Sequence, residues 1–333
     1  MSKYDSAMFV WKKEKRLDGI LVIHVDDFAY AGNTQWIEQV IDTFKQKFKI
    51  SAQAHGCFKY IGLNVHQDDT GITVDQKKYV SSLKTASLSN ERLRDKDAPL
   101  TEEDKSIHRS LSGHLLWVTS QTRPDMAYDS CVISNAGKQP TVRKIAEANK
   151  AIKKLQQRDE VKLRFPKLGK IEDLKIICYT DATHASLPSG ESQGAYIVFL
   201  AGGGKVAPVT WQSKKLHRVT KSPLASETLA LGEGADAGHL IASMLKEIFP
   251  LSNLPTVSCF TDNMSLRDAL HTTHIVDDMR LRVDIARLRE SIELKEITVD
   301  WVNKEAQLAD ALTKKNASAD ELLKVLCEAA LRC

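Results

Sequence analysis

Apolar residues recur along the first half of the chain with two different periods. Over residues 34–48 they fall three or four positions apart, which is the spacing of one face of an amphipathic α-helix. Shorter apolar runs on both sides of this segment predict strands instead, at 8–11, 19–25, 28–31, 58–65 and 71–74. Helical spacing returns further on and predicts helices near 76–86, 106–120 and 141–157. The charged stretch at 90–104 predicts a mobile connection.

The second half of the chain alternates short strands with helices. Its predicted strands are 176–181, 193–200, 206–211, 257–262 and 296–301. Ser222 and Pro223 suit the N-cap and first turn of a long helix that reaches about Phe249. Further helices are predicted at 278–293 and 305–314. This order predicts a mixed α/β fold.

The composition changes this picture little. With 333 residues, of which 42% are apolar and 27% charged, the chain fits an ordinary globular protein of about two or three domains. No apolar run approaches the roughly 18 residues that a membrane span needs, and the N-terminus does not look like a signal peptide. The six cysteines show no paired spacing, which favours a reducing compartment. We therefore expect an intracellular protein.

Four acids in the second half lie where predicted elements begin or end. Asp181 and Asp262 each end a strand, Glu227 lies near the start of the long helix, and Asp310 lies on the last helix. Taken singly, each acid fits a cap or an exposed turn better than a catalytic role. Together they favour a metal site, because acids at strand ends gather at one edge of a sheet and converging carboxylates repel unless cations sit between them. The pattern predicts about two Mg²⁺ or Mn²⁺ ions that serve phosphodiester hydrolysis.

A second acidic feature lies in the segment LVIHVDDFAYAG, where Asp26 and Asp27 stand side by side between two apolar runs. The runs predict a hairpin with the two carboxylates at its tip. A divalent metal would make such a pair tolerable. The dipeptide alone favours an exposed turn, since Asp is common there.

The residues around these acids resemble the ribonuclease H domain and the reverse transcriptase of copia-type LTR retrotransposon Pol polyproteins. The ribonuclease H motifs are Tyr179–Ala182, Gly202–Gly203, Val209–Lys215, Ser226–Leu231, Thr261–Asn263 and Gln307–Lys314. The motifs ahead of them are His24–Asp27, Tyr60–Leu63, Arg109–Leu116 and Thr122–Tyr128. The resemblance covers nearly the whole chain, which is similar to the C-terminal part of such a polyprotein.

The resemblance implies a fold, an activity and a set of site residues. The implied units are a truncated reverse-transcriptase palm and thumb, a connection segment, a ribonuclease H-like mixed five-stranded sheet with flanking helices, and a C-terminal tail, at 1–95, 96–170, 171–316 and 317–333. The implied activity is hydrolysis of the RNA strand of RNA–DNA hybrids with two Mg²⁺ or Mn²⁺ ions. Its catalytic and metal-holding residues would be Asp181, Glu227, Asp262 and Asp310. The family's third polymerase aspartate has no counterpart before residue 19, so Asp26 and Asp27 read as a remnant and DNA synthesis by this chain alone is not expected.

Two other hypotheses stay open: a catalytically inactive nucleic-acid-binding remnant, and a subunit that needs a partner for reverse transcription. Ser192 and Gln193 could contact RNA 2′-hydroxyls or form a plain turn, and Lys214 and Lys215 could hold a DNA strand. The net charge of +4 is too small to decide for nucleic acid. The expected partners are an RNA–DNA hybrid and other Pol or Gag products, with no membrane. The expected location is the cytoplasm, a virus-like particle or the nucleus.

Overall fold

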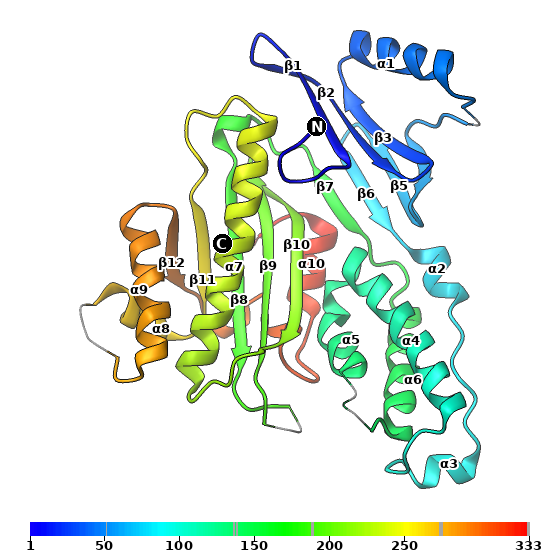
Figure 1. Ribbon diagram of the computed structural model, residues 1–333, viewed down its shortest axis with the longest axis vertical. Helices are drawn as coiled ribbons and strands as arrows, with labels where there is room; N and C mark the ends of the chain where they lie inside the picture. Colours follow the sequence, from blue (N-terminus) through cyan, green and yellow to red (C-terminus); the bar gives the residue numbers. More distant parts are fainter. Residues whose placement is uncertain (51, 136, 138, 188–189, 273–275, 332–333) are drawn as a thin grey trace.

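The computed structural model describes residues 1–50, 52–135, 137, 139–187, 190–272 and 276–331. Three β-sheets and a helical body make up the molecule (Figure 1). The first sheet is an antiparallel meander of β1 (Met8–Lys13), β2 (Arg16–His24) and β3 (Asp27–Gly32). Helix α1 (Thr34–Lys47) follows it and confirms the predicted helix, with Asn33 as N-cap.

The second sheet has the order β4-β5-β6-β7 and is antiparallel throughout. Its strands are β4 (Cys57–Tyr60), β5 (Leu63–Asp68), β6 (Gly71–Asp75) and β7 (Leu163–Pro166). The single strand predicted at 58–65 is wrong, because Ile61 and Gly62 both have positive φ angles, 46° and 75°, and form a tight turn there. The sequence pattern also missed β7, which is four residues long and reaches the sheet only after the intervening helices.

The helical body lies between β6 and β7 in the chain. Its helices are α2 (Lys77–Ser82), α3 (Asn90–Arg94), α4 (Glu102–Gln121), α5 (Ala127–Ser134) and α6 (Val142–Gln157), with a 3₁₀ turn η1 (Pro124–Met126). The predicted charged connection at 90–104 instead contains α3 and the start of α4, where Thr101 and Asp104 form a capping box. Helix α5 was not predicted, because its eight residues are too few to show a helical period.

The third sheet has the order β10-β9-β8-β11-β12. Its strands are β8 (Lys175–Thr183), β9 (Gln193–Gly202), β10 (Lys205–Lys215), β11 (Val257–Thr261) and β12 (Ile297–Trp301), and a 3₁₀ turn η2 (Ile171–Asp173) precedes them. Strand β9 is antiparallel to β8 and β10, whereas β8, β11 and β12 are parallel. The five predicted strands are confirmed, and so is the mixed sheet.

Alternate residues of β8 point to opposite faces of this sheet, as strand geometry requires. Ile176 and Cys178 pack in one apolar cluster under α7 (Pro223–Ile248), α8 (Met264–His271) and α9 (Met279–Glu293). Tyr179 packs on the other face, in a cluster that includes residues of α10 (Asp320–Glu328), which the pattern did not predict. The helix predicted at 305–314 is wrong: the chain forms two 3₁₀ turns, η3 (Lys304–Ala306) and η4 (Asp310–Leu312).

Helix α7 lies close to the sheet because two of its three glycines face the strands. A Cβ atom at Gly234 would be 2.5 Å from the Thr180 Cγ2 atom, and one at Gly238 would be 2.5 Å from Val257 Cγ1. Both distances are far below any real Cβ contact. The backbone of α7 therefore rests almost directly on β8 and β11.

The helical body and the third sheet share apolar and polar contacts. Ala127 of α5 belongs to the same buried cluster as Leu312 of η4. The Trp211 Nε1 atom of β10 donates a hydrogen bond to the Thr119 carbonyl of α4 at 2.7 Å. These contacts fix α4 and α5 relative to the third sheet and η4.

Candidate metal centre

Three carboxylates meet at one end of the third sheet. Asp181 lies near the end of β8, Asp262 directly follows β11, and Asp310 begins η4. The register explains the first two, because Phe260 is paired with Tyr179 in parallel strands and two further steps along each bring Asp262 beside Asp181. One carboxylate oxygen from each of the three acids lies within 4.8 Å of the others. The structure thus brings together three acids that are far apart in the sequence.

Glu227 of α7 faces the same cluster. It is buried, and burial together with the charges of Asp181 and Asp262 holds the pKa of its carboxyl well above the ordinary value. The carboxylate accepts a hydrogen bond from the backbone N–H of Ala182, which opposes this rise. Its Oε2 atom is buried without a hydrogen-bond partner. Such an orphaned oxygen is costly unless a cation or a proton satisfies it.

Asp181 is the most buried member, with 1% of its surface exposed. Burial raises the pKa of its carboxyl to about 6, although Lys314 and the Thr313 hydroxyl favour the charged form. The Thr313 hydroxyl donates a hydrogen bond to the Asp181 Oδ2 atom. The nearby charges of Asp262 and Asp310 add to the rise in pKa. In the absence of a cation, the Asp181 carboxyl is therefore about half protonated at about pH 6.

Lys314 places an ammonium group among these acids. Its Nζ atom lies 3.4 Å from Asp181 Oδ2 and forms a closer ion pair with Asp310 Oδ1. Burial lowers the pKa of Lys314, but Asp181 and Asp310 outweigh it, so the pKa is raised. No role was predicted for Lys314, although its position four residues after Asp310 was a usable signal.

Hydrogen bonds attach the loop that carries Asp310 to the sheet. Gln307 Nε2 donates to the Thr180 carbonyl at 3.0 Å, and Ser213 Oγ donates to the Leu312 carbonyl at 2.5 Å. Trp301 Nε1 donates to the Asp262 carbonyl at 3.1 Å on the other side of the cluster. These three bonds hold the backbone around the acids in place without using a carboxylate oxygen.

The other four residues predicted in this half lie around the cluster. Ser192 and Gln193 are buried, and the Ser192 Oγ atom accepts a hydrogen bond from the backbone N–H of Ala185 at 3.0 Å. In this conformation their side chains hold loops together rather than face solvent. Lys214 pairs with Glu233 at 2.9 Å and Lys215 with Glu191 at 3.1 Å, so neither ammonium is free. Their predicted role in nucleic-acid binding stays a prediction.

Asp26 and Asp27 lie in a different environment, at the turn between β2 and β3. Both are exposed, and Val25 before them has a positive φ of 53°. Tyr60 lies near this pair. Burial and the charge of Asp27 raise the pKa of the Tyr60 phenol. Among the described residues, the group of three acids close enough to hold one metal ion is Asp181, Asp262 and Asp310. Asp26 and Asp27 do not belong to such a group.

The donor set of the first cluster suits a hard divalent cation. All of its ligand atoms are carboxylate oxygens, which are the ligands that Mg²⁺ and Mn²⁺ prefer, and no cysteine or histidine belongs to the group. The unpartnered Glu227 Oε2 adds a fourth oxygen that lacks a protein donor. The residues therefore fit such an ion.

The strand order, the antiparallel β9 and the acids at the ends of the two central parallel strands define a ribonuclease H-like fold. No family model matches the sequence. The chain is 28% identical over 217 residues to a protein of Saccharomyces cerevisiae described as a transposon Ty5-1 protein, and the match covers 61% of this chain and 68% of that protein. The chain is similar to this transposon protein, in agreement with the resemblance of its motifs.

Solved structures with the same kind of sheet include two ribonucleases H1. That of Halobacterium salinarum is 19% identical with a TM-score of 0.33, over 42% of this chain and 94% of its own. The LC11 enzyme in complex with an RNA/DNA hybrid is 16% identical with a TM-score of 0.34, over 45% and 99%. A foamy viral protease–reverse transcriptase with an RNA/DNA hybrid is 12% identical with a TM-score of 0.43, over 90% of this chain and 37% of its own. None of the helices in the described part of the chain has the length and apolar composition needed to cross a membrane.

Proposed function

We propose that the chain is a divalent-metal-dependent endoribonuclease that hydrolyses the RNA strand of RNA–DNA hybrids. The observation that carries this proposal is the acidic cluster at the end of a ribonuclease H-like sheet, in which Asp181 and Glu227 are buried and Glu227 Oε2 is left unpartnered. Burying several carboxylates together is unfavourable unless cations neutralise them. A site used only for stability would not leave a buried carboxylate oxygen such as Glu227 Oε2 without a partner.

Asp181, Glu227, Asp262 and Asp310 would hold two Mg²⁺ or Mn²⁺ ions. Asp181 would serve both ions, Glu227 and Asp262 would complete one position, and Asp310 the other. Such ions lower the pKa of an attacking water and neutralise charge on the leaving oxygen of a phosphodiester. The predicted units at 1–95 and 96–170 would help to hold the hybrid.

The protein groups around the acids have their own part in this function. The Thr313 hydroxyl and the Trp301 indole fix the positions of Asp181 and of the Asp262 backbone. Lys314 neutralises part of the cluster until a cation replaces it, because its ammonium lies beside Asp181 and Asp310. We infer no polymerase activity for this chain alone, since Asp26 and Asp27 are exposed and lack a third acid among the described residues.

The test is cleavage of a labelled RNA strand annealed to DNA, with Mg²⁺ or Mn²⁺. The parent chain is expected to cut this RNA and to spare the DNA strand and single-stranded RNA. Asp181→Asn and Glu227→Gln should each remove cleavage while the hybrid still binds. Asp69→Asn is the matched control, because Asp69 is an exposed turn acid far from the cluster in sequence and makes the same charge change.

One observation favours a second candidate, a nucleic-acid-binding remnant without activity. Lys314 already provides a cation to Asp181 and Asp310, so the cluster is partly neutralised without metal. In that case the parent would bind the hybrid but would not cut it with either metal. The same assay therefore decides between the two candidates.

A further inference from the structure

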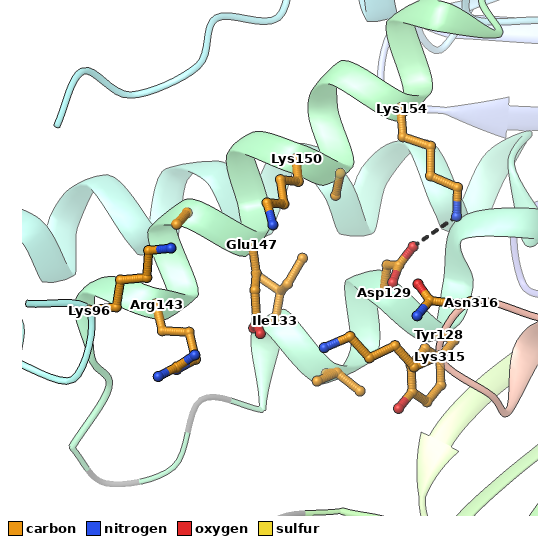
Figure 2. A pocket seen from close by; sticks show the side chains of 13 residues that line it. Lys96, Tyr128, Asp129, Ile133, Arg143, Glu147, Lys150, Lys154, Lys315 and Asn316 are labelled. Carbon is orange, nitrogen blue, oxygen red and sulfur yellow. Dashed lines mark hydrogen bonds and ion pairs between the residues drawn. The ribbon is translucent and has the colours of Figure 1, made fainter. Parts of the chain in front are cut away.

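A basic pocket opens beside the metal centre, between the helical body and the loop after η4. It has a volume of about 340 Å³ and lies between α5, α6 and residues 315–316 (Figure 2). Five of its lining side chains are cationic, namely Lys96, Arg143, Lys150, Lys154 and Lys315. Two are acidic, Asp129 and Glu147. The pocket therefore has an excess of positive charge.

The two acids of the pocket do not neutralise Lys96, Lys150 or Lys315. Asp129 pairs with Lys154 at 3.3 Å. Glu147 pairs with Lys144, which lies outside the lining, at 3.1 Å. Arg143 pairs with Asp97, which is also outside the lining. Across the described part of the chain, no ion-pair partner is found for Lys96, Lys150 or Lys315.

Two of the lysines without an ion-pair partner among the described residues line the pocket from different elements. Figure 2 shows Lys150 reaching inward from α6 and Lys315 from the loop after η4. Like charges gathered in one concave site repel each other, so an anion that binds between them gains free energy. A phosphate diester fits this chemistry, because its oxygens accept charge-assisted hydrogen bonds from lysine and arginine.

One short turn joins the pocket to the metal centre. Thr313 and Lys314 contact Asp181, whereas the next two residues, Lys315 and Asn316, line the pocket. Asn316 has a positive φ of 62°, so the chain reverses there. Because each nucleotide adds about 3.4 Å along a strand, an anion site next to this turn is within a few nucleotides of the acids.

The walls of the pocket are held firmly. Arg123 forms two hydrogen bonds of 2.8 Å with the buried Asp125 carboxylate and also donates to the Arg158 carbonyl at the end of α6, at 3.0 Å. Ala127 at the start of α5 packs in one cluster with Leu312 of η4. The distance between the lysines and the acids is therefore fixed by the fold.

We propose that this pocket binds a backbone phosphate of the nucleic-acid substrate a few nucleotides from the cut bond and sets the position of cleavage. The inference rests on the proposed function, since it takes the substrate to be a nucleic acid. Phosphate contacts of this kind fix register and orientation without reading sequence. The pocket would thus set the distance along the nucleic acid between a bound phosphate and the bond that is cut.

The test compares Lys150→Gln, Lys315→Gln and the double variant with the parent chain. Binding of a labelled RNA–DNA hybrid is measured in EDTA, where no cutting occurs, over a series of salt concentrations. The double variant should bind about tenfold or more weakly at low salt, and the slope of log K against log salt should fall by about one for each lysine. Both lysines are exposed, so the variants should fold like the parent. Lys175→Gln is the matched control, because Lys175 is exposed at the opposite end of β8 from Asp181 and makes the same charge change.

The second readout is the cleavage pattern. With Mg²⁺ the parent should cut at preferred distances from the hybrid end, and the double variant should spread the cuts over more positions. An unchanged salt slope in the double variant, or an equal fall in Lys175→Gln, overturns the inference. So does binding of inorganic phosphate that depends on both lysines while hybrid binding does not, because the pocket is then a small-anion site.

The two proposals fail in different ways. If the parent cuts hybrids and the lysine substitutions leave binding and the cleavage pattern unchanged, the nuclease function is supported and the phosphate site is rejected. If the parent never cuts, but hybrid binding in EDTA depends on both lysines, the phosphate site is supported and the nuclease function is rejected.

Discussion

The molecule contains two groups of aspartates, and their surroundings differ in almost every respect. Asp26 and Asp27 are neighbours in one turn and are exposed to solvent. Asp181, Asp262 and Asp310 come from three separate elements, lie within 4.8 Å of one another and are joined by a buried Glu227. Adjacent carboxylates in water repel each other weakly, whereas converging buried ones do so strongly. A metal centre is thus marked by convergence and burial more than by the number of acids in a sequence motif.

The largest difference between the two groups is expected in catalysis. Asp181→Asn should lower hybrid cleavage by roughly three orders of magnitude, about 4 kcal/mol of barrier, because a shared metal ligand is lost. Asp26→Asn should leave the rate within about twofold, which corresponds to less than about 0.5 kcal/mol of barrier. Single-turnover cleavage under matched conditions measures both. Equal losses in the two variants would mean that the exposed pair serves the nuclease.

The buried group should also make stability depend on pH. An ordinary aspartate carboxyl has a pKa of 3.8, whereas the pKa of Asp181 is about 6 in the folded chain, so the folded state binds the proton more tightly. Without metal, this acid contributes stability that is present below about pH 4 and is lost as the pH rises through about 6, on the order of 3 kcal/mol in all. Because a metal ligand must be ionised, the stabilisation by Mg²⁺ should grow over the same range.

Thermal unfolding in EDTA and in Mg²⁺, from about pH 5 to about pH 7.5, checks this expectation. Asp181→Asn is the control, since it removes one of the two buried titrating groups and should make the curve less steep in EDTA, while Glu227 keeps its own contribution. A metal effect that does not change with pH would contradict the assignment of Asp181 as a ligand.

The close approach of α7 sharpens the comparison, because the exposed pair has no such support. Gly234→Val places atoms within 2.5 Å of Thr180 and 2.8 Å of Cys178, so helix and strand must separate. We expect a loss of about 1–3 kcal/mol in unfolding free energy and a fall in cleavage, since Glu227 moves with the helix. Urea unfolding and cleavage assays measure the two effects.

Gly113→Ala is the matched control for that substitution. Gly113 lies inside α4 with no atom within 4 Å of the added Cβ, so stability should rise by about 0.5–1 kcal/mol. A loss of stability in the control would mean that α4 does not accept a side chain at this position.

Lys314 should matter more without metal than with it. Lys314→Met removes the cation beside Asp181 and Asp310 and should destabilise the chain in EDTA by about 1–2 kcal/mol, less than a fully buried pair because 32% of the lysine side chain is exposed. In saturating Mn²⁺ the loss should shrink. Titration of Mn²⁺ should also show tighter binding in the variant, and weaker binding would contradict the idea that lysine and metal compete.

The smallest effect is expected at the exposed turn. Asp27→Asn should change the unfolding free energy by no more than about 0.5 kcal/mol, as for most surface substitutions. Chemical denaturation with and without Mg²⁺ measures it. A clear Mg²⁺ dependence that the variant abolishes would show that the pair binds metal after all.

The sequence was sufficient for those parts of the structure that depend on short-range pattern. The five strands of the third sheet and the long helix after Ser222 have apolar periods or caps that identify them, and the acids lie at their ends. The turn at Ile61 and Gly62 was missed because an apolar run hides it, and η4 was predicted as a helix because its apolar spacing is helical while its role is to join Asp310 to the sheet.

The remaining features depend on long-range contacts that no local pattern contains. Lys314 pairs with Asp181, which lies in a different element far earlier in the chain. The pocket between α6 and Lys315 likewise exists only because two distant segments pack together. Such features need the register of the sheet and the docking of the helical body, which the sequence specifies only collectively.

The absent side chains of Gly234 and Gly238 have one more consequence. At Gly234, the spacing between α7, which carries Glu227, and β8, which carries Asp181, is set by the helix backbone, with no helix side chain between the two elements. Substitution of apolar residues under α8 and α9 by others of similar size should therefore leave this spacing unchanged. The spacing between the two elements that carry Glu227 and Asp181 is thus expected to change little when the surrounding core changes.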